Sequence, residues 1–281
     1  MTPIVTGTEQ LLRDLETLPA QQAVALHVLQ VAGDPRSSAQ DLSEALVADP
    51  AMTAQVIRLA NSAYYGLSGR VSTVAFAVTI VGFASIRSVV AAFAAGALGD
   101  DATVPDGFWQ RASASASSCS LVASRVGAQR PDAFSVGLLH ELGDFLLYRS
   151  SPEEHARLHA EVDHWSCRRR SFHEREVFGV DHGEAIARCL DAWLFPPEFV
   201  EAMSCHVRAE ELAPPLARTL VGGQAVSALS LLADGDRSLG SELMLALRPA
   251  LRLGRVEVDA AWGMSRQARA DAATLAASFG S

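Results

Sequence analysis

Apolar side chains recur along the chain at the three- and four-residue spacing of amphipathic helices. A first stripe over 11–18 is followed by a second, formed by Val24, Val28 and Val31, that ends near Gly33. The alternation of apolar and polar positions that half-buried strands require is almost absent. The pattern therefore predicts an all-α protein with helices from one end of the chain to the other.

Capping residues and breaks fix several of the helix boundaries. Asp49 is a good N-cap and Pro50 fits the first helical turn, so a helix is expected to begin there. The segment 74–98 is almost continuously apolar, but Gly82 divides it and Arg87 lies beyond the break. Because each half is too short to cross a bilayer, the segment predicts two buried helices and no membrane span.

The rest of the chain continues the helical pattern. The segment after Pro131 is apolar almost all round, which is typical of a buried central helix. Further helices are expected at 152–164, 166–178, 182–194, 197–207, 214–233 and 241–281. A polar stretch over 100–107 predicts two lobes, 1–100 and 101–210, with a helical tail over 211–281 that packs on the second lobe.

Composition and charge narrow the classes of function. The 281 residues are 49% hydrophobic and carry a net charge of −9, which disfavours binding to a nucleic-acid backbone. The one dense basic run, Arg168 to Arg170, is typical of a solvated helix face. The four cysteines show no CxxC spacing, and the first residues show no signal peptide, so we expect a reduced, cytoplasmic protein.

The step His140-Glu141 lies inside the most apolar helix of the chain, where an ionised glutamate is costly unless it is paired. The two residues are either a pair of metal ligands or a hydrogen-bonded polar pair in a helix bundle, and the step alone favours the second interpretation. Asp144, four residues after His140, lies on the same helix face and can hold that histidine in a structural role.

The other histidines give weaker signals. His182 lies at the start of a helix, and His206 lies on an apolar helix, where a histidine is more often a core residue than a ligand. The remaining five lie on polar faces: His27, His155, His159, His164 and His173. The sequence contains no GxSxG, P-loop or HExxH motif.

The segment Arg58–Gly66, RLANSAYYG, resembles the most recognisable stretch of HDOD domains, and Gly137–Gly143, GLLHELG, resembles their GLLHDIG motif. Phe108-Trp109 and the segment 178–196 resemble two further family motifs, so the resemblance covers about residues 8–210. It implies a two-lobed helical fold whose second lobe is a degraded form of the HD phosphohydrolase fold. It also implies that Asn61, Tyr64, Tyr65 and Gly66 form a structural motif.

Members of the HD superfamily bind metal through histidine and aspartate and hydrolyse phosphoesters. HDOD domains resemble this superfamily, and the resemblance implies that they have lost the hydrolytic activity. Here Arg111 stands where a metal-binding member has a histidine, and Glu141 replaces the aspartate of the HD pair. Val207 replaces the second of two adjacent histidines, and a late aspartate of the superfamily falls near Gln224. The resemblance leaves a remnant cleft whose expected ligand-binding residues are Arg111, His140, Glu141, His182 and His206.

The resulting hypothesis is a bacterial signal-transduction module that binds a signalling protein or a small ligand, without catalysis, metal or cofactor. The remnant cleft and the groove between the lobes are the expected surfaces. Two alternatives stay open. One is a metal-dependent phosphohydrolase that acts on a nucleotide or cyclic dinucleotide, and the other is a non-catalytic nucleotide sensor in which Arg111 binds a phosphate.

Two contacts are expected within these motifs. Arg111 should pair with Glu141, because the planar guanidinium matches a buried carboxylate that needs a counter-charge. Asn61 should be buried and should bind backbone groups in the turn before Gly66.

Overall fold

The computed structural model describes residues 23–99, 102–161, 167–207, 213–232 and 237–279. Within these ranges all the regular structure is helical and no strand occurs, which confirms the predicted all-α class. The helix expected over 11–18 and His164 lie outside the described residues.

The first part of the chain forms short helices with well-made ends. Asp49 caps the third of them as predicted, because its Oδ1 accepts from the backbone N–H groups of Ala51 and Met52 at 2.8 and 3.0 Å. The elements are α2 (Ala23–Gly33), α3 (Ala39–Val47), α4 (Pro50–Ala60), the 3₁₀ turn η2 (Ala63–Tyr65), α5 (Val74–Val81) and α6 (Phe83–Ala94).

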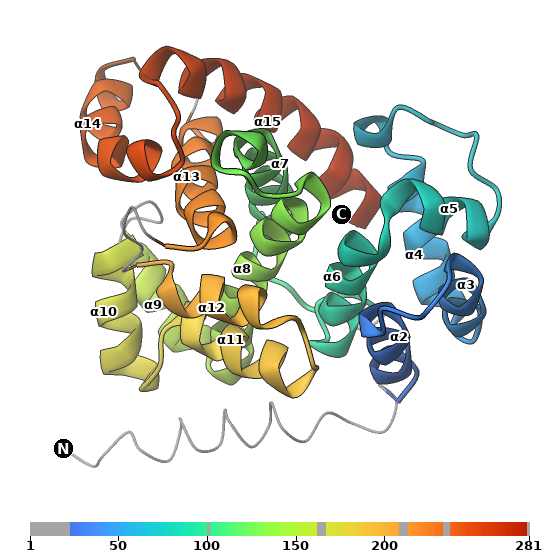
Figure 1. The fold of residues 1–281 in the computed structure, drawn as a ribbon. Helices are drawn as coiled ribbons and strands as arrows, with labels where there is room; N and C mark the ends of the chain where they lie inside the picture. The colour runs from blue at the N-terminus through green and yellow to red at the C-terminus, as the bar shows by residue number, and fades with distance from the viewer. Residues whose placement is uncertain (1–22, 100–101, 162–166, 208–212, 233–236, 280–281) are drawn as a thin grey trace.

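The second part is built around one buried helix, α8 (Arg130–Ser150), as its all-round apolar pattern predicts. Helix α8 packs against α6, α7, α11 and α13 and lies at the centre of the molecule (Figure 1). The other elements are α7 (Phe108–Val126), α9 (Pro152–Glu161), α10 (Cys167–Phe178), α11 (His182–Ala192), α12 (Pro197–Cys205), α13 (Pro215–Ser230), α14 (Arg237–Leu253) and α15 (Val258–Phe279).

Gly82 separates α5 from α6, as predicted, with a backbone φ of 81° that a residue with a side chain rarely adopts. Among the described residues, no single helix has the length and apolar composition needed to cross a membrane. Helices α5 and α6 meet that test only when taken together, across a bend of 109°.

One hydrophobic core runs through most of the fold, from Ala25 in α2 to Phe279 at the end of α15. The last helix contacts both parts of the chain: the Phe279 ring stacks on Trp109 of α7 with 4.5 Å between centroids, and Gln55 of α4 donates to the Ser278 carbonyl at 2.8 Å. Because this core spans both sides of residue 100, the division into two lobes and a tail stays a prediction.

Arg87 joins α6 to the end of α11. Its side chain is buried, lies 4.0 Å from the centre of the Phe195 ring, and donates to the backbone carbonyls of Trp193 and Leu194. Burial lowers the pKa of this guanidinium to about 10. The arginine that interrupts the apolar segment 74–98 therefore satisfies carbonyl groups that the end of α11 leaves without helical partners.

Asn61 holds a loop closed, but in a different way from the predicted one. Its amide donates to the Val71 carbonyl at 2.7 Å and accepts from the Val71 N–H at 2.9 Å, and it is half-buried. The side chain thus pairs with Val71 across the loop as a peptide group would, instead of binding the turn before Gly66. Its second donated bond, to the Ile57 carbonyl at 3.1 Å, ties the loop to α4.

The rest of this motif packs around the loop. The Tyr64 hydroxyl donates to Ser120 Oγ in α7 at 3.0 Å, and the Tyr64 ring meets the Tyr65 ring edge to face with 5.0 Å between centroids. Gly66 ends η2 in the left-handed region, with φ of 70°. The motif therefore joins α4 to α7.

We predict that Asn61→Ala lowers the free energy of unfolding by about 1–3 kcal/mol, because both polar groups of Val71 lose their partner. Thermal or urea unfolding measures this loss. Gln40→Ala is the matched control, because Gln40 is exposed and, among the described residues, donates to Glu44 on its own helix face. Equal stability of the two variants would contradict the assigned role of Asn61.

Candidate functional site

Three of the predicted site residues meet in the interior. His140 comes from the middle of α8, His182 is the first residue of α11, and His206 follows the last residue of α12. All three are buried, and one ring nitrogen of each lies within 4.8 Å of the others. We call this group the histidine cluster.

Two glycines allow the helices to approach closely enough for the cluster to form. A Cβ atom on Gly143 would lie 2.3 Å from the carbonyl oxygen of His182, and one on Gly183 would lie 2.2 Å from the His206 ring. No side chain fits at either place. The glycine that ends the GLLHELG segment is therefore required for the contact of α8 with α11.

A chain of hydrogen bonds runs through His140 in the tautomer that carries its proton on Nε2. The Ser115 hydroxyl donates to the Gly137 carbonyl at 2.8 Å, so its oxygen accepts from Gln224 Nε2 at 2.7 Å. The same amide nitrogen lies 3.1 Å from His140 Nδ1, which accepts from it when the ring carries its proton on Nε2; Glu141 Oε1 lies 3.5 Å from the same Nδ1. The proton of neutral His140 is then on Nε2, on the side of His182.

The chain continues from His140 into α10. His140 Nε2 lies 3.1 Å from His182 Nε2, which accepts the proton of His140. His182 then carries its own proton on Nδ1, which donates to Glu174 Oε2 at 2.5 Å. In this chain of hydrogen bonds each donor faces an acceptor, so the rings of His140 and His182 are held together without a metal ion between them.

His206 is the exception in the cluster. Its Nδ1 donates to the Met203 carbonyl at 2.7 Å, while its buried Nε2 has no hydrogen-bond partner among the described residues. Burial lowers the pKa of His206 well below its usual value, so the ring is neutral and Nε2 presents a lone pair.

A second buried group lies beside the cluster and is built on Asp144. One oxygen of this carboxylate, Oδ1, accepts from Arg170 Nη2 at 2.7 Å, His155 Nε2 at 2.8 Å and His159 Nε2 at 3.1 Å. Arg170 also donates to Glu174 Oε1 at 2.7 Å. We call these five residues the Asp144 network.

The charges in this network stabilise one another. Burial raises the pKa of Asp144, but the charge of Arg170 and the hydrogen bonds from His155 and His159 lower it by more than burial raises it. The pKa of Asp144 therefore lies well below its usual value. Burial also raises the pKa of Glu174, but the neighbouring His182 and Arg170 lower it by more, so it too lies below its usual value. Both carboxylates are therefore ionised at neutral pH.

Several expectations about these residues are wrong. Arg170 does not lie on a solvated helix face but is buried, because α10 turns it toward Asp144. His155 is buried and His159 half-buried, and both bind Asp144. Asp144 is engaged by these partners and does not hold His140.

Arg111 also differs from the expectation. Its ion pair is with Asp144, at 3.8 Å between Nη2 and Oδ2, and not with Glu141, and its Nη1 donates to the Asp106 carbonyl at 2.9 Å. Arg111 acts on Glu141 only through its charge. Burial raises the pKa of Glu141, while the neighbouring His140, Arg111 and Arg170 lower it to about 2.

Two groups of side chains come close enough to hold a metal ion among the described residues: the histidine cluster, and Asp144 with His155 and His159. In each group a metal would have to displace a contact that the described residues already make. In the first, it would have to separate His140 Nε2 from His182 Nε2, which lie 3.1 Å apart. In the second, the Arg170 guanidinium already occupies the oxygen that a cation would bind.

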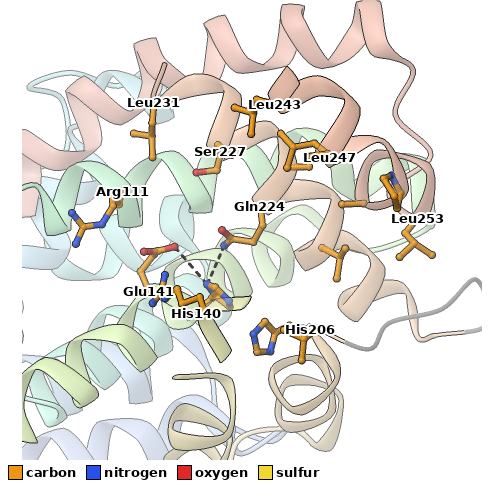
Figure 2. Close-up of a pocket in the computed structure, with 18 of the residues that line it drawn as sticks. Arg111, His140, Glu141, His206, Gln224, Ser227, Leu231, Leu243, Leu247 and Leu253 are labelled. Atoms are coloured by element: carbon orange, nitrogen blue, oxygen red, sulfur yellow. Dashed lines mark hydrogen bonds and ion pairs between the residues drawn. The ribbon is translucent and has the colours of Figure 1, made fainter. Parts of the chain in front are cut away.

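The histidine cluster opens into a cavity of about 640 Å³, shown in Figure 2. Its polar side is formed by Arg111, Glu141, Arg170 and Gln224 together with His140 and His206. Of the predicted ligand-binding residues, only His182 does not line it. Gln224 and Arg170 complete the site, and only Gln224 has a sequence signal, its place near the late aspartate of the superfamily.

The comparisons with known proteins agree with this architecture. The sequence profile of the HDOD domain matches residues 18–209. A solved structure of a provisionally assigned phosphohydrolase from Shewanella amazonensis SB2B is 25% identical, with a TM-score of 0.71 over 97% of this chain and 98% of that one. No protein with a curated description matches the chain.

Two further solved structures share the fold. An HDOD domain protein of unknown function from Geobacter sulfurreducens is 20% identical, with a TM-score of 0.63 over 98% of each chain. A provisionally assigned signal transduction protein from Marinobacter aquaeolei VT8 is 21% identical, with a TM-score of 0.67 over 99% of this chain and 66% of that one.

We predict that Arg170→Ala lowers the free energy of unfolding by about 3–5 kcal/mol, because it leaves Asp144 and Glu174 buried without their shared cation. Chemical denaturation measures this loss. Arg169→Ala is the matched control from the same helix, because Arg169 is exposed. A loss for Arg170→Ala no larger than that of the control would show that the network does not hold the fold.

We also predict that stability falls as the pH drops below about 6.5, the ordinary pKa of histidine. The unfolded chain takes up a proton at His206 there, whereas the folded chain, with its lowered pKa, does not. In His206→Phe the slope of unfolding free energy against pH should therefore decrease between pH 6.5 and 5, by up to about 1.4 kcal/mol per pH unit. An unaltered slope in His206→Phe would refute the assignment.

Proposed function

Because the chain belongs to the HDOD family, we propose that it is a signal-transduction module that binds a signalling protein or a small ligand in its cleft without turning it over. The free thiols of Cys119, Cys189 and Cys205 fit a reducing compartment, and we propose the cytoplasm. No nucleic acid is expected as a partner, given the net charge of −9.

The observation that carries this proposal is the hydrogen-bond chain from Gln224 through His140 and His182 to Glu174. A catalytic metal needs unprotonated imidazole nitrogens and one open position. In this chain the nitrogens that face one another share a proton. The arrangement supports a cleft that keeps its shape without a metal.

Arg111 supports the same proposal. It stands where the resemblance puts a metal-binding histidine, and it lines the cavity next to Glu141. A fixed positive charge there repels a divalent cation and attracts electron-rich groups of a ligand. Gln224, near the place of the late aspartate, supplies N–H groups instead of a carboxylate.

A metal-dependent phosphohydrolase that acts on a nucleotide or cyclic dinucleotide is the second candidate. Two observations favour it: the close approach of three histidine nitrogens, and the similarity to the Shewanella amazonensis protein. A non-catalytic nucleotide sensor is the third, since Arg111 has the geometry to bind a phosphate.

We predict that the purified protein contains no stoichiometric iron, manganese or zinc and does not hydrolyse bis-p-nitrophenyl phosphate. Elemental analysis and a colorimetric assay measure the two quantities. The double variant Arg111→His with Gln224→Asp restores two metal-binding residue types and should raise the metal content toward one equivalent.

Comparing the metal content of the wild-type protein with that of the double variant makes the result decisive. One equivalent of metal in the wild-type protein, together with hydrolysis that a chelator abolishes, would establish the phosphohydrolase instead. Wild-type protein without metal, next to a double variant that gains it, supports a cleft that these two residues keep free of metal.

A further inference from the structure

The cavity beside the histidine cluster has two unlike sides. Figure 2 shows Arg111, Glu141, His140 and His206 along one side, and Leu231, Leu243 and Leu247 along the other. The apolar side comes from α13 and α14, which lie beyond the segment 18–209 that matches the HDOD profile. These helices thus convert a polar cleft into a cavity with an apolar wall.

From this arrangement we infer that the cavity binds a neutral amphiphile, a medium-chain aliphatic compound with an amide head. This inference rests on the proposed function, because it names the ligand of the same cleft. The aliphatic chain lies along α13 and α14, and the amide meets the polar side. A cavity of about 640 Å³ has the size of sites that enclose small organic ligands.

The head needs a hydrogen-bond donor because of His206. The ring lines the cavity, and its buried Nε2 is a lone-pair acceptor that has no donor among the described residues. A buried acceptor of this kind is costly unless a ligand or water satisfies it. An amide N–H is a donor that requires no charge.

The head also needs an acceptor because of Arg111. This guanidinium lines the same cavity, and its Nε has no hydrogen-bond partner in the part of the chain that the structure describes. Its ion pair with Asp144 is long, at 3.8 Å, so it keeps capacity for a further partner. A carbonyl oxygen is an acceptor that fits this donor without adding charge.

The charges around the cavity favour a neutral head. Three ionised carboxylates, Glu141, Asp144 and Glu174, face two guanidiniums, Arg111 and Arg170, in and behind the polar side. An added anion would increase an existing excess of negative charge. An added cation would find Asp144 and Glu174 already bonded to arginine or histidine, and Glu141 already in the field of Arg111 and Arg170.

The test is a calorimetric titration of the full chain with decanamide, decanoate and decyltrimethylammonium, which share a chain and differ in head charge. We expect decanamide to bind one site at least tenfold more tightly than either charged compound. His206→Phe should reduce this preference for the amide at least tenfold, because the acceptor is lost. Equal affinity for decanoate, or no binding of decanamide, would overturn the inference.

Two variants of neighbouring residues in α14 locate the site. Ala246 lines the cavity, whereas Leu245 is exposed and does not. Ala246→Trp should therefore weaken decanamide binding at least tenfold, and Leu245→Trp should leave it within twofold. Equal effects of the two substitutions would show that decanamide binds elsewhere.

The outcome also separates this inference from the proposed function. Failure of decanamide to bind a wild-type protein that holds no metal and hydrolyses no phosphodiester would overturn the amphiphile alone. Stoichiometric metal with phosphodiester hydrolysis would overturn the proposed function, whatever the titration shows.

Discussion

The fold depends on the burial of one carboxylate, Asp144, in the middle of its most central helix. Removing such a group from water costs several kcal/mol, which only a full set of partners offsets. Its partners come from α9 and α10, and Arg170 extends the contact to Glu174. Because Glu174 in turn binds both the backbone N–H and the ring of His182, the buried charge fixes where α11 begins. One ion pair therefore sets the relative positions of four helices.

This arrangement explains how the site keeps its shape without an ion. In a metal site, second partners orient the ligand histidines and the metal joins them. Here Glu174 and the Met203 carbonyl orient His182 and His206 in the same way, but a proton between His140 and His182 takes the place of the metal. The cost is one buried acceptor, His206 Nε2, that the protein itself leaves without a donor among its described residues.

Periodicity and capping were sufficient to predict most of the helices, including the buried α8 and the break at Gly82, because these depend on local sequence. The expected helix over 241–281 is wrong, because the chain breaks between α14 and α15, where Arg255 has a φ of 53°. The contacts of the site were harder to predict. Arg170 and Asp144 are 26 positions apart, and nothing in a run of three arginines shows which one turns inward. A usable signal was present in the four-residue spacing of His155 and His159, which puts both on one helix face toward Asp144.

The two arginines of the site have different roles, and the difference separates stability from recognition. Arg170 is buried and bonded to both Asp144 and Glu174, so a change there disturbs the fold before it affects any ligand. Arg111 is more exposed, lines the cavity and makes one long ion pair, and its buried Nε has no hydrogen-bond partner among the described residues. The resemblance implied that Arg111 takes the place of the metal, but the buried charge of Asp144 is neutralised mainly by Arg170. Arg111 is thereby left available at the cavity wall, where a ligand can use it without breaking the network behind it.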